Sequence, residues 1–207
     1  YREAMVLPEQ PKSIIIVGAG AIGVEFAYFY NSIGTKVTIV EFAPRIVPVE
    51  DVDVSRELER LYRKYGMTIM TESAVESVDT SGACVKAKVK TPTGDVILEA
   101  DVLLSATGVQ ANIENIGLET VGVKTEKGKV VVDDFYQTSV AGIYAIGDLL
   151  PTQALAHVAS AEGITCVEHI AGHHPEKIDY SNIPGCTYCV PEIASVGMTE
   201  EAAKKAG

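Results

Sequence analysis

The sequence predicts an α/β fold, in which helices cover a parallel sheet and an antiparallel meander is inserted into it. Residues 14–17, Ile-Ile-Ile-Val, form a run of apolar β-branched side chains that is typical of a parallel strand buried on both faces. Apolar and small side chains between Ala21 and Ile33 recur at helical spacing. Between Ala74 and Ala100 the pattern changes to a period of two, and turn signals such as Ser81-Gly82 divide it into the short strands of a meander.

Three glycines follow the first strand at the spacing G-x-G-x-x-G. Gly18 can adopt the turn, Gly20 allows backbone to approach a pyrophosphate, and Gly23 allows the helix to lie against the strand. The free N–H groups and the positive dipole end of the helix then face the phosphates. The spacing alone also fits a structural turn without a ligand, but its place between an apolar strand and a helix favours a dinucleotide site.

An acidic residue ends the second predicted strand, which covers residues 36–40. Glu41 stands 18 residues after Gly23. A carboxylate at this place accepts hydrogen bonds from an adenosine ribose, and its charge repels a 2′-phosphate. The sequence therefore predicts a Rossmann-like domain that binds NAD in preference to NADP.

The other elements of the first half follow in chain order. Residues 1–12 contain two prolines and predict a linker, and Gly34 is the expected C-terminal cap of the first helix. Two further prolines break the loop of residues 42–48. A helix is predicted from Asp51 to Lys64, with strands at residues 67–70 and 101–106.

The second half predicts shorter elements. They are a hairpin over residues 122–133, a strand from Gly142 to Asp148, a helix over roughly Thr152 to Ala171, a strand from Pro184 to Val190 and a helix from Glu200 to Ala206 that Thr199 caps. Asp148, at a strand end beside a glycine, is placed to bind sugar hydroxyls, although a turn or capping role is common for such an aspartate. His157 alone fits a core or helix-start histidine.

Composition restricts the class of partner. The 207 residues carry 28 acidic side chains against 17 Lys and Arg, a formal charge of −11, which argues against nucleic acid or an anionic membrane as a main partner. No apolar run approaches the roughly 20 residues of a membrane span. Four cysteines are too few for a disulfide scaffold, and Cys186 and Cys189 lack the second pair that a zinc site requires. We expect structural cysteines, with redox use of Cys186 and Cys189 as the alternative, and no metal site.

Several short motifs together resemble the dihydrolipoamide dehydrogenase family of flavin disulfide reductases. The resemblance covers nearly the whole chain and rests on residues 15–27, 37–41, 106–108, 142–148, 155–157, 162–163 and 191–200. It departs from the family after Gly108, where the family often continues Gly-Arg-x-Pro-Asn and this chain has Gly108-Val109-Gln110-Ala111-Asn112. The missing arginine removes a charged contact expected there but leaves the fold.

The resemblance implies two cofactors, NAD and FAD, and a set of binding residues. For NAD these are Gly18, Ala19, Gly20, Ala21, Ile22 and Gly23 at the pyrophosphate, with Val24 next to them, Glu41 at the adenosine ribose, Val75 in the adenine pocket, and Glu25 and Gly108 toward the nicotinamide. For FAD they are Asp148, toward the ribityl chain, and Ala154, Leu155, Ala156 and His157, toward the flavin. None of these residues is a catalytic group.

The resemblance also implies a larger enzyme than this chain. We expect an NAD-binding domain over residues 1–112, the returning part of an FAD domain over 113–178, and the start of an interface domain over 179–207. The redox disulfide, the first glycine motif and the His-Glu base of the family are absent from this chain, so we expect it to bind NAD weakly and to turn over no lipoamide. The full-length enzyme is expected to be a cytoplasmic homodimer that oxidises dihydrolipoamide and reduces NAD, in some settings within a 2-oxo acid dehydrogenase complex.

Two other functions remain open at this point. A related reductase, of the mercuric or coenzyme A disulfide type, shares these motifs. A non-catalytic NAD-sensing module would need only the glycine turn and Glu41.

Overall fold

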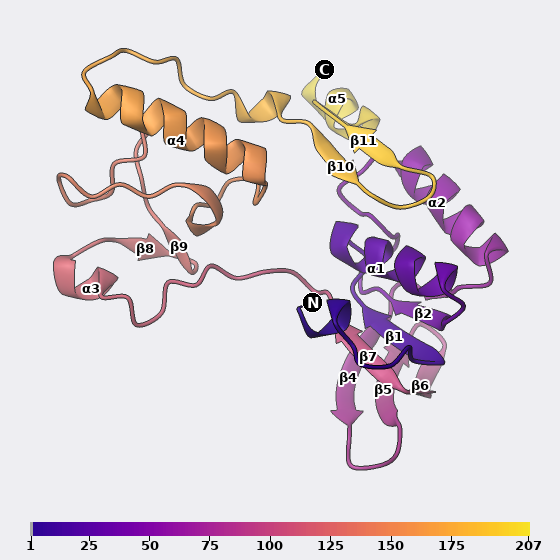
Figure 1. Cartoon of the computed structure of the whole chain (residues 1–207). Coiled ribbons are helices and arrows are strands. Elements are labelled where there is room, and N and C mark those ends of the chain that lie inside the picture. The colour runs from indigo at the N-terminus through magenta and orange to yellow at the C-terminus, as the bar shows by residue number, and fades with distance from the viewer. Residues whose placement is uncertain (1) are drawn as a thin grey trace. The chain divides into compact units, whose positions relative to one another are not determined.

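The computed structural model describes residues 2–207, and these form two compact units (Figure 1). The first unit consists of residues 2–108 together with Pro184–Gly207, and the second of Val109–Ile183. The division into three domains at residues 112 and 178 stays a prediction. The predicted linker begins at Tyr1, which lies outside the described residues.

The first unit is built on a four-stranded sheet whose strands are all parallel. Its order is β3-β2-β1-β7, with β1 at Ser13–Val17, β2 at Lys36–Val40, β3 at Thr68–Met70 and β7 at Val102–Ser105. Ile15 of β1 pairs with Thr38 of β2 and Leu103 of β7. The predicted α/β class and the four predicted strands are confirmed.

Two helices cover one face of this sheet. Helix α1, Ala21–Ser32, and helix α2, Val52–Lys64, share a buried core with the sheet residues Ile14, Ile16 and Ile39. Tyr62 of α2 is fully buried, and its hydroxyl donates to the Val24 carbonyl of α1 at 2.8 Å. Gly34 follows α1 with a φ of +94°, as expected of a helix-ending glycine.

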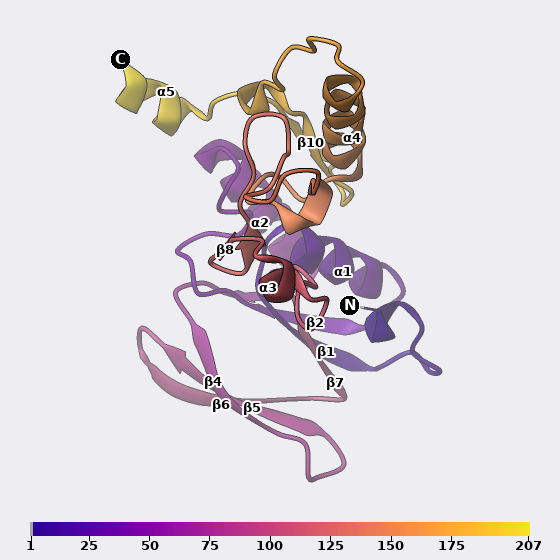
Figure 2. The same ribbon diagram turned by 90° about the vertical axis from the view of Figure 1, so that its left-hand side faces the viewer.

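The meander covers the opposite face (Figure 2). Its antiparallel strands β4 (Ala74–Asp79), β5 (Val85–Thr91) and β6 (Gly94–Ala100) bury Ala87, Val89 and Ala100 against Ile15 and Val40. Its lysines stay solvated on the other side, where Lys88 pairs with Glu76 and Asp95 at 2.7 and 2.9 Å. The predicted meander is confirmed.

The two ends of the described chain pack into the first unit. Residues 2–12 are not a free linker, because Ala4 lies in the core and its carbonyl accepts the Tyr30 hydroxyl. The C-terminal segment forms a hairpin of β10 (Gly185–Thr187) and β11 (Ile193–Ser195), followed by α5 (Glu200–Ala206) with Thr199 as its cap. The predicted strand over 184–190 is thus shorter than expected. All four cysteines are free, and Cys189 is buried in the core.

The second unit has little regular structure besides one long helix. It contains α3 (Leu118–Val121), the two-residue strands β8 (Thr125–Glu126) and β9 (Lys129–Val130), and α4 (Ala156–Ile170). Its core includes Val130, Tyr136, Leu150 and Cys166.

Two expectations for the second unit are wrong. The predicted strand from Gly142 to Asp148 is absent: only Tyr144 forms an isolated bridge, to Gln137, and Gly147–Leu149 make a 3-10 turn that starts at φ +69°. The predicted helix start at Thr152 is four residues early, because residues 152–155 run outside the helix and Leu155 is the extended N-cap. Short apolar runs do not show whether a partner strand exists to pair with them.

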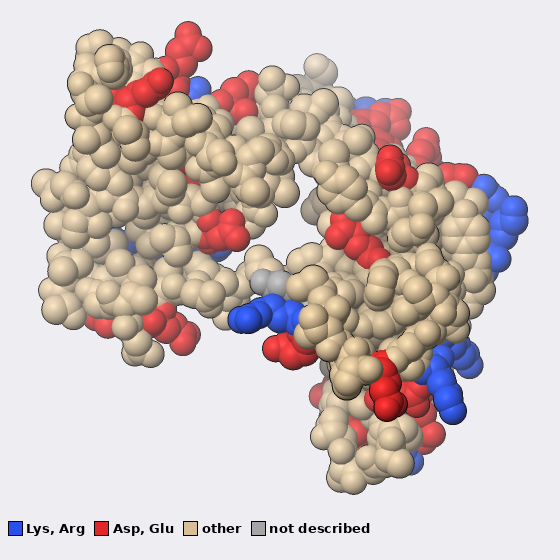
Figure 3. Space-filling view, viewed as in Figure 1, with Lys and Arg blue, Asp and Glu red and all other residues tan. Residues whose placement is uncertain are grey.

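The distribution of charge on the surface and the hydropathy of the helices agree with the expectations from composition. Acidic side chains are spread over the face of the molecule shown in Figure 3, among basic and uncharged ones. Of the helices formed by residues 2–207, none combines the length and the apolar character that a membrane crossing requires.

Candidate functional site

The three glycines of the first turn are needed for different reasons. A Cβ on Gly18, whose φ is +98°, would lie 2.5 Å from the Ala106 carbonyl oxygen, and a Cβ on Gly23 would lie 2.0 Å from the Gly18 carbonyl oxygen. Both positions are therefore glycine because protein backbone occupies the space. At Gly20 a Cβ would meet nothing within 4 Å. The fold itself therefore does not require a glycine at position 20. A ligand phosphate that approaches the protein backbone here does require one, because a side chain would occupy the same space.

The open space at Gly20 lies at the start of α1. Gly20 is the extended N-cap of α1, and its missing side chain provides no capping oxygen. The first N–H groups of a helix have no partner within the helix, and they carry the positive end of its dipole. This is a site for an anion, and the residues present fit the pyrophosphate of a dinucleotide.

Glu41 is joined to the same turn. The residue is 9% exposed, and one carboxylate oxygen accepts the Ala19 N–H at 2.5 Å while the other accepts the Ala43 N–H at 2.7 Å. The carboxylate at the end of β2 is thus fixed next to the glycine turn by two backbone donors. A carboxylate oxygen can accept more than one hydrogen bond, so ribose hydroxyls still have acceptors here.

The proline-containing loop of residues 42–48 also forms a hydrogen bond with the glycine turn. The Val47 N–H donates to the Ala19 carbonyl at 2.7 Å, although Val47 is a buried β-branched residue with a φ of +40°. A β-branched residue in this conformation is strained. Sequence reasoning gave this loop no role, because neither proline indicates a hydrogen bond across 28 residues of chain.

The other predicted NAD residues differ in what they can contact. Ala19 and Val24 are fully buried, so only their backbone atoms can reach a ligand, whereas Ala21 is exposed and Ile22 is half-buried. One carboxylate oxygen of Glu25 accepts the N–H of Tyr188, from the C-terminal hairpin, at 2.7 Å.

Val75 and Gly108 lie at the ends of two further segments of this unit. Val75 is at the start of β4, whose preceding residue Ser73 donates its N–H to the Glu41 carbonyl at 2.9 Å. The structure therefore brings the start of β4 to Glu41. Gly108 has a φ of +124° and ends this part of the unit.

The predicted FAD residues gather at the start of α4 in the second unit. Asp148 is exposed in the turn Gly147–Leu149, and its carboxylate makes no hydrogen bond or ion pair with any of residues 2–207. A Cβ on Gly147 would lie 3.2 Å from the Ala159 Cβ of α4, so turn and helix are in close contact. Leu155 caps α4 and Ala156 and His157 begin it, with Ala154 just before. A free acceptor beside a helix start fits the hydroxyls and phosphates of a flavin dinucleotide.

Glu162 of α4 is a residue whose role sequence reasoning missed. It is 0% exposed, and its carboxylate accepts the Gly147 N–H at 2.6 Å, the Thr152 hydroxyl at 2.9 Å and the Tyr180 hydroxyl at 2.8 Å. Burial, together with the hydrogen bonds to Tyr136 and Glu162, raises the pKa of the Tyr180 hydroxyl. An acidic residue in the middle of an apolar helix pattern was the available signal.

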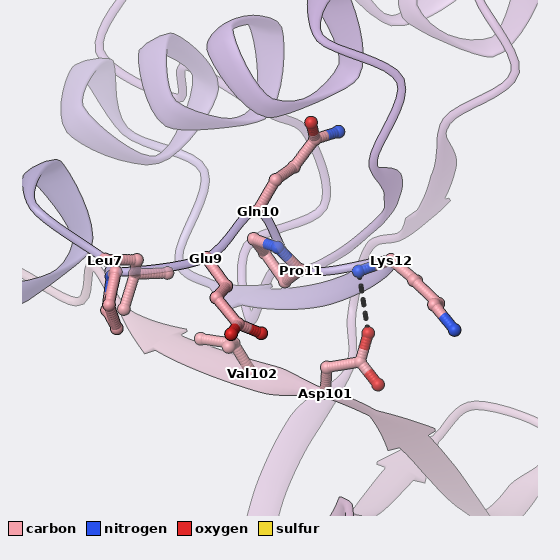
Figure 4. Close-up of a pocket in the computed structure, with 8 residues that line it drawn as sticks. Leu7, Glu9, Gln10, Pro11, Lys12, Asp101 and Val102 are labelled. Carbon is pink, nitrogen blue, oxygen red and sulfur yellow. Dashed lines mark hydrogen bonds between the residues drawn. The ribbon is translucent and has the colours of Figure 1, made fainter.

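A cavity of the first unit is lined by none of the predicted NAD-binding residues. It measures about 420 Å³ and is lined by residues 7–12 with Asp101 and Val102, where the Lys12 N–H donates to the Asp101 carboxylate at 2.7 Å (Figure 4). Residues 7–12 precede β1, Asp101 precedes β7 and Val102 begins it, so the cavity lies at the amino ends of these strands, opposite the edge that carries Gly18 and Glu41. Ligands of parallel sheets bind at the carboxyl edge. Within residues 2–207, no group of three or more His, Cys, Asp or Glu side chains could hold a metal ion.

Known proteins resemble this chain in sequence and in structure. Residues 2–163 match the family model "Pyridine nucleotide-disulphide oxidoreductase". Dihydrolipoyl dehydrogenases from Rhizobium etli and Chlorobaculum tepidum are 49% and 48% identical over 100% of this chain. The chain spans 44% of the length of each of these relatives.

Solved structures agree with the sequence relatives. LpdA from Mycobacterium tuberculosis superposes with a TM-score of 0.88 at 30% identity, over 97% of this chain and 43% of LpdA. The Cu(II) complex of a cysteine-to-serine mutant of the flavoprotein disulfide reductase RclA from Escherichia coli gives a TM-score of 0.90 at 30% identity, over 97% of this chain and 45% of that chain. With the family model matching residues 2–163, these findings show that the chain belongs to the pyridine nucleotide-disulphide oxidoreductase family, whose dihydrolipoyl dehydrogenases use FAD and NAD.

Proposed function

We propose that this chain is the NAD-binding and partial FAD-binding segment of an NAD-dependent dihydrolipoyl dehydrogenase. One observation carries the NAD part: the space at Gly20 is open, whereas the spaces at Gly18 and Gly23 are filled by backbone. The carboxylate of Glu41 is hydrogen-bonded to the same turn through the Ala19 N–H. An anion site and a ribose acceptor joined in this way suit a dinucleotide without a 2′-phosphate.

The residues of this chain bind and orient rather than react. The N–H groups at the start of α1 would hold the NAD pyrophosphate, Glu41 the adenosine ribose, and Asp148 a hydroxyl of the FAD ribityl chain. When bound, the two cofactors supply the hydride and electron transfer that oxidises dihydrolipoamide and reduces NAD. The redox disulfide and the His-Glu base that this activity requires would come from parts of the enzyme outside this chain.

The wider setting is part of the same proposal. The relatives named above span more than twice the length of this chain. We expect the full-length enzyme to be a homodimer in the cytoplasm that can work within a 2-oxo acid dehydrogenase complex. Dihydrolipoamide oxidation by the full-length protein, with NAD as acceptor, separates this proposal from a mercuric or coenzyme A disulfide reductase and from an NAD sensor without activity.

Titration of the chain with NADH and with NADPH tests the binding part. We expect NADH to bind with at least tenfold higher affinity than NADPH, and we expect Glu41→Gln to reduce that ratio, because the amide cannot repel the 2′-phosphate. A thermal melt of each sample shows whether the chain is folded. A folded chain that binds neither nucleotide would contradict the proposal.

A further inference from the structure

The turn that carries Asp148 is held from two sides by charged groups. The Gly147 N–H donates to the Glu162 carboxylate at 2.6 Å, and the Asp148 carbonyl accepts the Lys129 ammonium group at 2.6 Å. The Leu150 N–H closes the turn on the Gly147 carbonyl at 2.9 Å. The backbone on both sides of Asp148 is therefore fixed, while its carboxylate remains exposed and without a partner among residues 2–207.

Glu162 joins this turn to the segment that leads into α4. Its second oxygen accepts the hydroxyls of Thr152, in that segment, and of Tyr180, which in turn is hydrogen-bonded to the hydroxyl of Tyr136 at 3.1 Å. One carboxylate thus connects residue 147, residue 152 and the middle of α4. Thr152 and Gly147 flank the stretch of chain that contains Asp148.

A fully buried carboxylate is costly unless its lone pairs are used. Glu162 has 0% exposure and three donors, so its charge is compensated by hydrogen bonds and, as far as residues 2–207 are concerned, by no cation. Stability alone does not require such a group, because an apolar side chain of similar size is often at least as stabilising in a core. A network of this kind gives one fixed arrangement of the segments that it joins.

On the proposed function, and resting on it, we propose that Glu162 is a positioning residue for FAD, which acts through Asp148. By fixing the Gly147 N–H, the Glu162 carboxylate holds the turn, and with it the Asp148 carboxylate, in one arrangement in which Asp148 can meet the flavin nucleotide. Glu162 does not touch the cofactor. Ligand groups bind more tightly when their positions are set before binding.

The test uses the full-length protein after removal of its flavin, with FAD as the probe. FAD affinity is measured by flavin fluorescence, and folding by thermal melting. Glu162→Asp keeps the charge but draws the carboxylate back by one methylene, so that it no longer reaches the Gly147 N–H. We expect the FAD dissociation constant to rise at least tenfold. Glu162→Gln keeps an acceptor for the Gly147 N–H, and we expect FAD affinity within about threefold of the unsubstituted protein.

Two comparisons separate positioning from general destabilisation. Tyr180→Phe removes a donor to Glu162 but leaves its bond to Gly147, so melting temperature should fall while FAD affinity stays within threefold. In an Asp148→Asn background, Glu162→Asp should change FAD affinity less than threefold, because its effect runs through Asp148. Hydrogen exchange of the Gly147 amide should accelerate in Glu162→Asp and stay slow in Tyr180→Phe.

The outcomes distinguish this inference from the proposed function. If Asp148→Asn weakens FAD binding while Glu162→Asp leaves it unchanged, or weakens it equally in both backgrounds, the positioning role is wrong and the FAD site stands. If the unsubstituted protein binds no FAD, both proposals fail.

Discussion

The glycines of the nucleotide turn differ in what a methyl group added to each of them would contact. A methyl group at Gly18 would collide with the Ala106 carbonyl oxygen, and the left-handed φ of this residue is unfavourable for any side chain. A methyl group at Gly20, whose φ is −71°, would enter open space. We expect Gly18→Ala to destabilise the chain by about 2 kcal/mol or more. Gly20→Ala should change stability by no more than about 0.5 kcal/mol but weaken NADH binding about tenfold or more. Denaturant melts and NADH titrations of the two variants measure both effects. Equal NADH affinity of Gly20→Ala and the unsubstituted chain would falsify the assignment.

At the level of single residues, the sequence indicates some features of the site but not others. The positions of Gly18, Gly20 and Glu41 follow from local spacing, because strand, turn and helix are consecutive. The bond from Glu41 to Ala19 and the three bonds of Glu162 join residues 10 to 22 positions apart, and no periodic pattern encodes them. The role of Glu162 therefore became visible only when its partners were located.

Among the elements, α1 and α2 are joined by one buried hydroxyl. Tyr62 donates to the Val24 carbonyl, and burial strongly raises the pKa of its hydroxyl. We expect Tyr62→Phe to lower the free energy of unfolding by about 1 kcal/mol, the net value of one such hydrogen bond, because the ring keeps its packing. NADH affinity should not change. Denaturant unfolding of both proteins measures the difference, and a loss of NADH binding would show that α2 shapes the nucleotide site directly.

Asp51 links two helices that are far apart in the sequence. Its carboxylate accepts the Asp53 N–H at the start of α2 and the Glu200 N–H at the start of α5. These bonds, with that to Glu200 largest, hold the pKa of Asp51 below its ordinary value. A lowered folded-state pKa stabilises the chain above the unfolded pKa of about 3.9 and loses this contribution as pH falls through the folded value.

The expected result is pH-dependent attachment of α5. As pH falls from 4 to 2, the protection of the Glu200 amide against hydrogen exchange, measured relative to its intrinsic exchange rate at each pH, should decrease in the unsubstituted chain. In Asp51→Asn this protection should already be lower at pH 5 and should vary less with pH. Exchange that follows global unfolding at every pH would contradict a local role for Asp51.

Elements were predicted well where they bury a periodic face and poorly where they do not. The pattern of α1, β1 and the meander repeats because each packs against the sheet core. The segment Gly142–Asp148 has a strand-like composition, but only Tyr144 finds a bridging partner, and the turn at Gly147 is fixed by Glu162 instead. A tertiary hydrogen bond overrode the local preference.

At the scale of the whole molecule, the chain is two compact units with separate cores. The first contains the residues proposed for NAD and the second those proposed for FAD. We expect two unfolding transitions, of which NADH shifts only one. At a concentration 100 times its dissociation constant, NADH should stabilise the first unit by about 2.7 kcal/mol. Calorimetry with and without NADH, and peptide-level hydrogen exchange to assign the transitions, measure this. If NADH also slowed hydrogen exchange in residues Val109–Ile183, the two units would not be independent.

The open space at Gly20 also has an evolutionary consequence. A lineage that keeps this scaffold but abandons its nucleotide would retain Gly18 and Gly23, since chain folding depends on them, while position 20 would be free to drift. A substitution at position 20 would then indicate that the ligand had been lost, although the thermal stability and the shape of the protein had not yet changed. In a collection of descendants, a side chain at that one position would identify the pseudoenzymes.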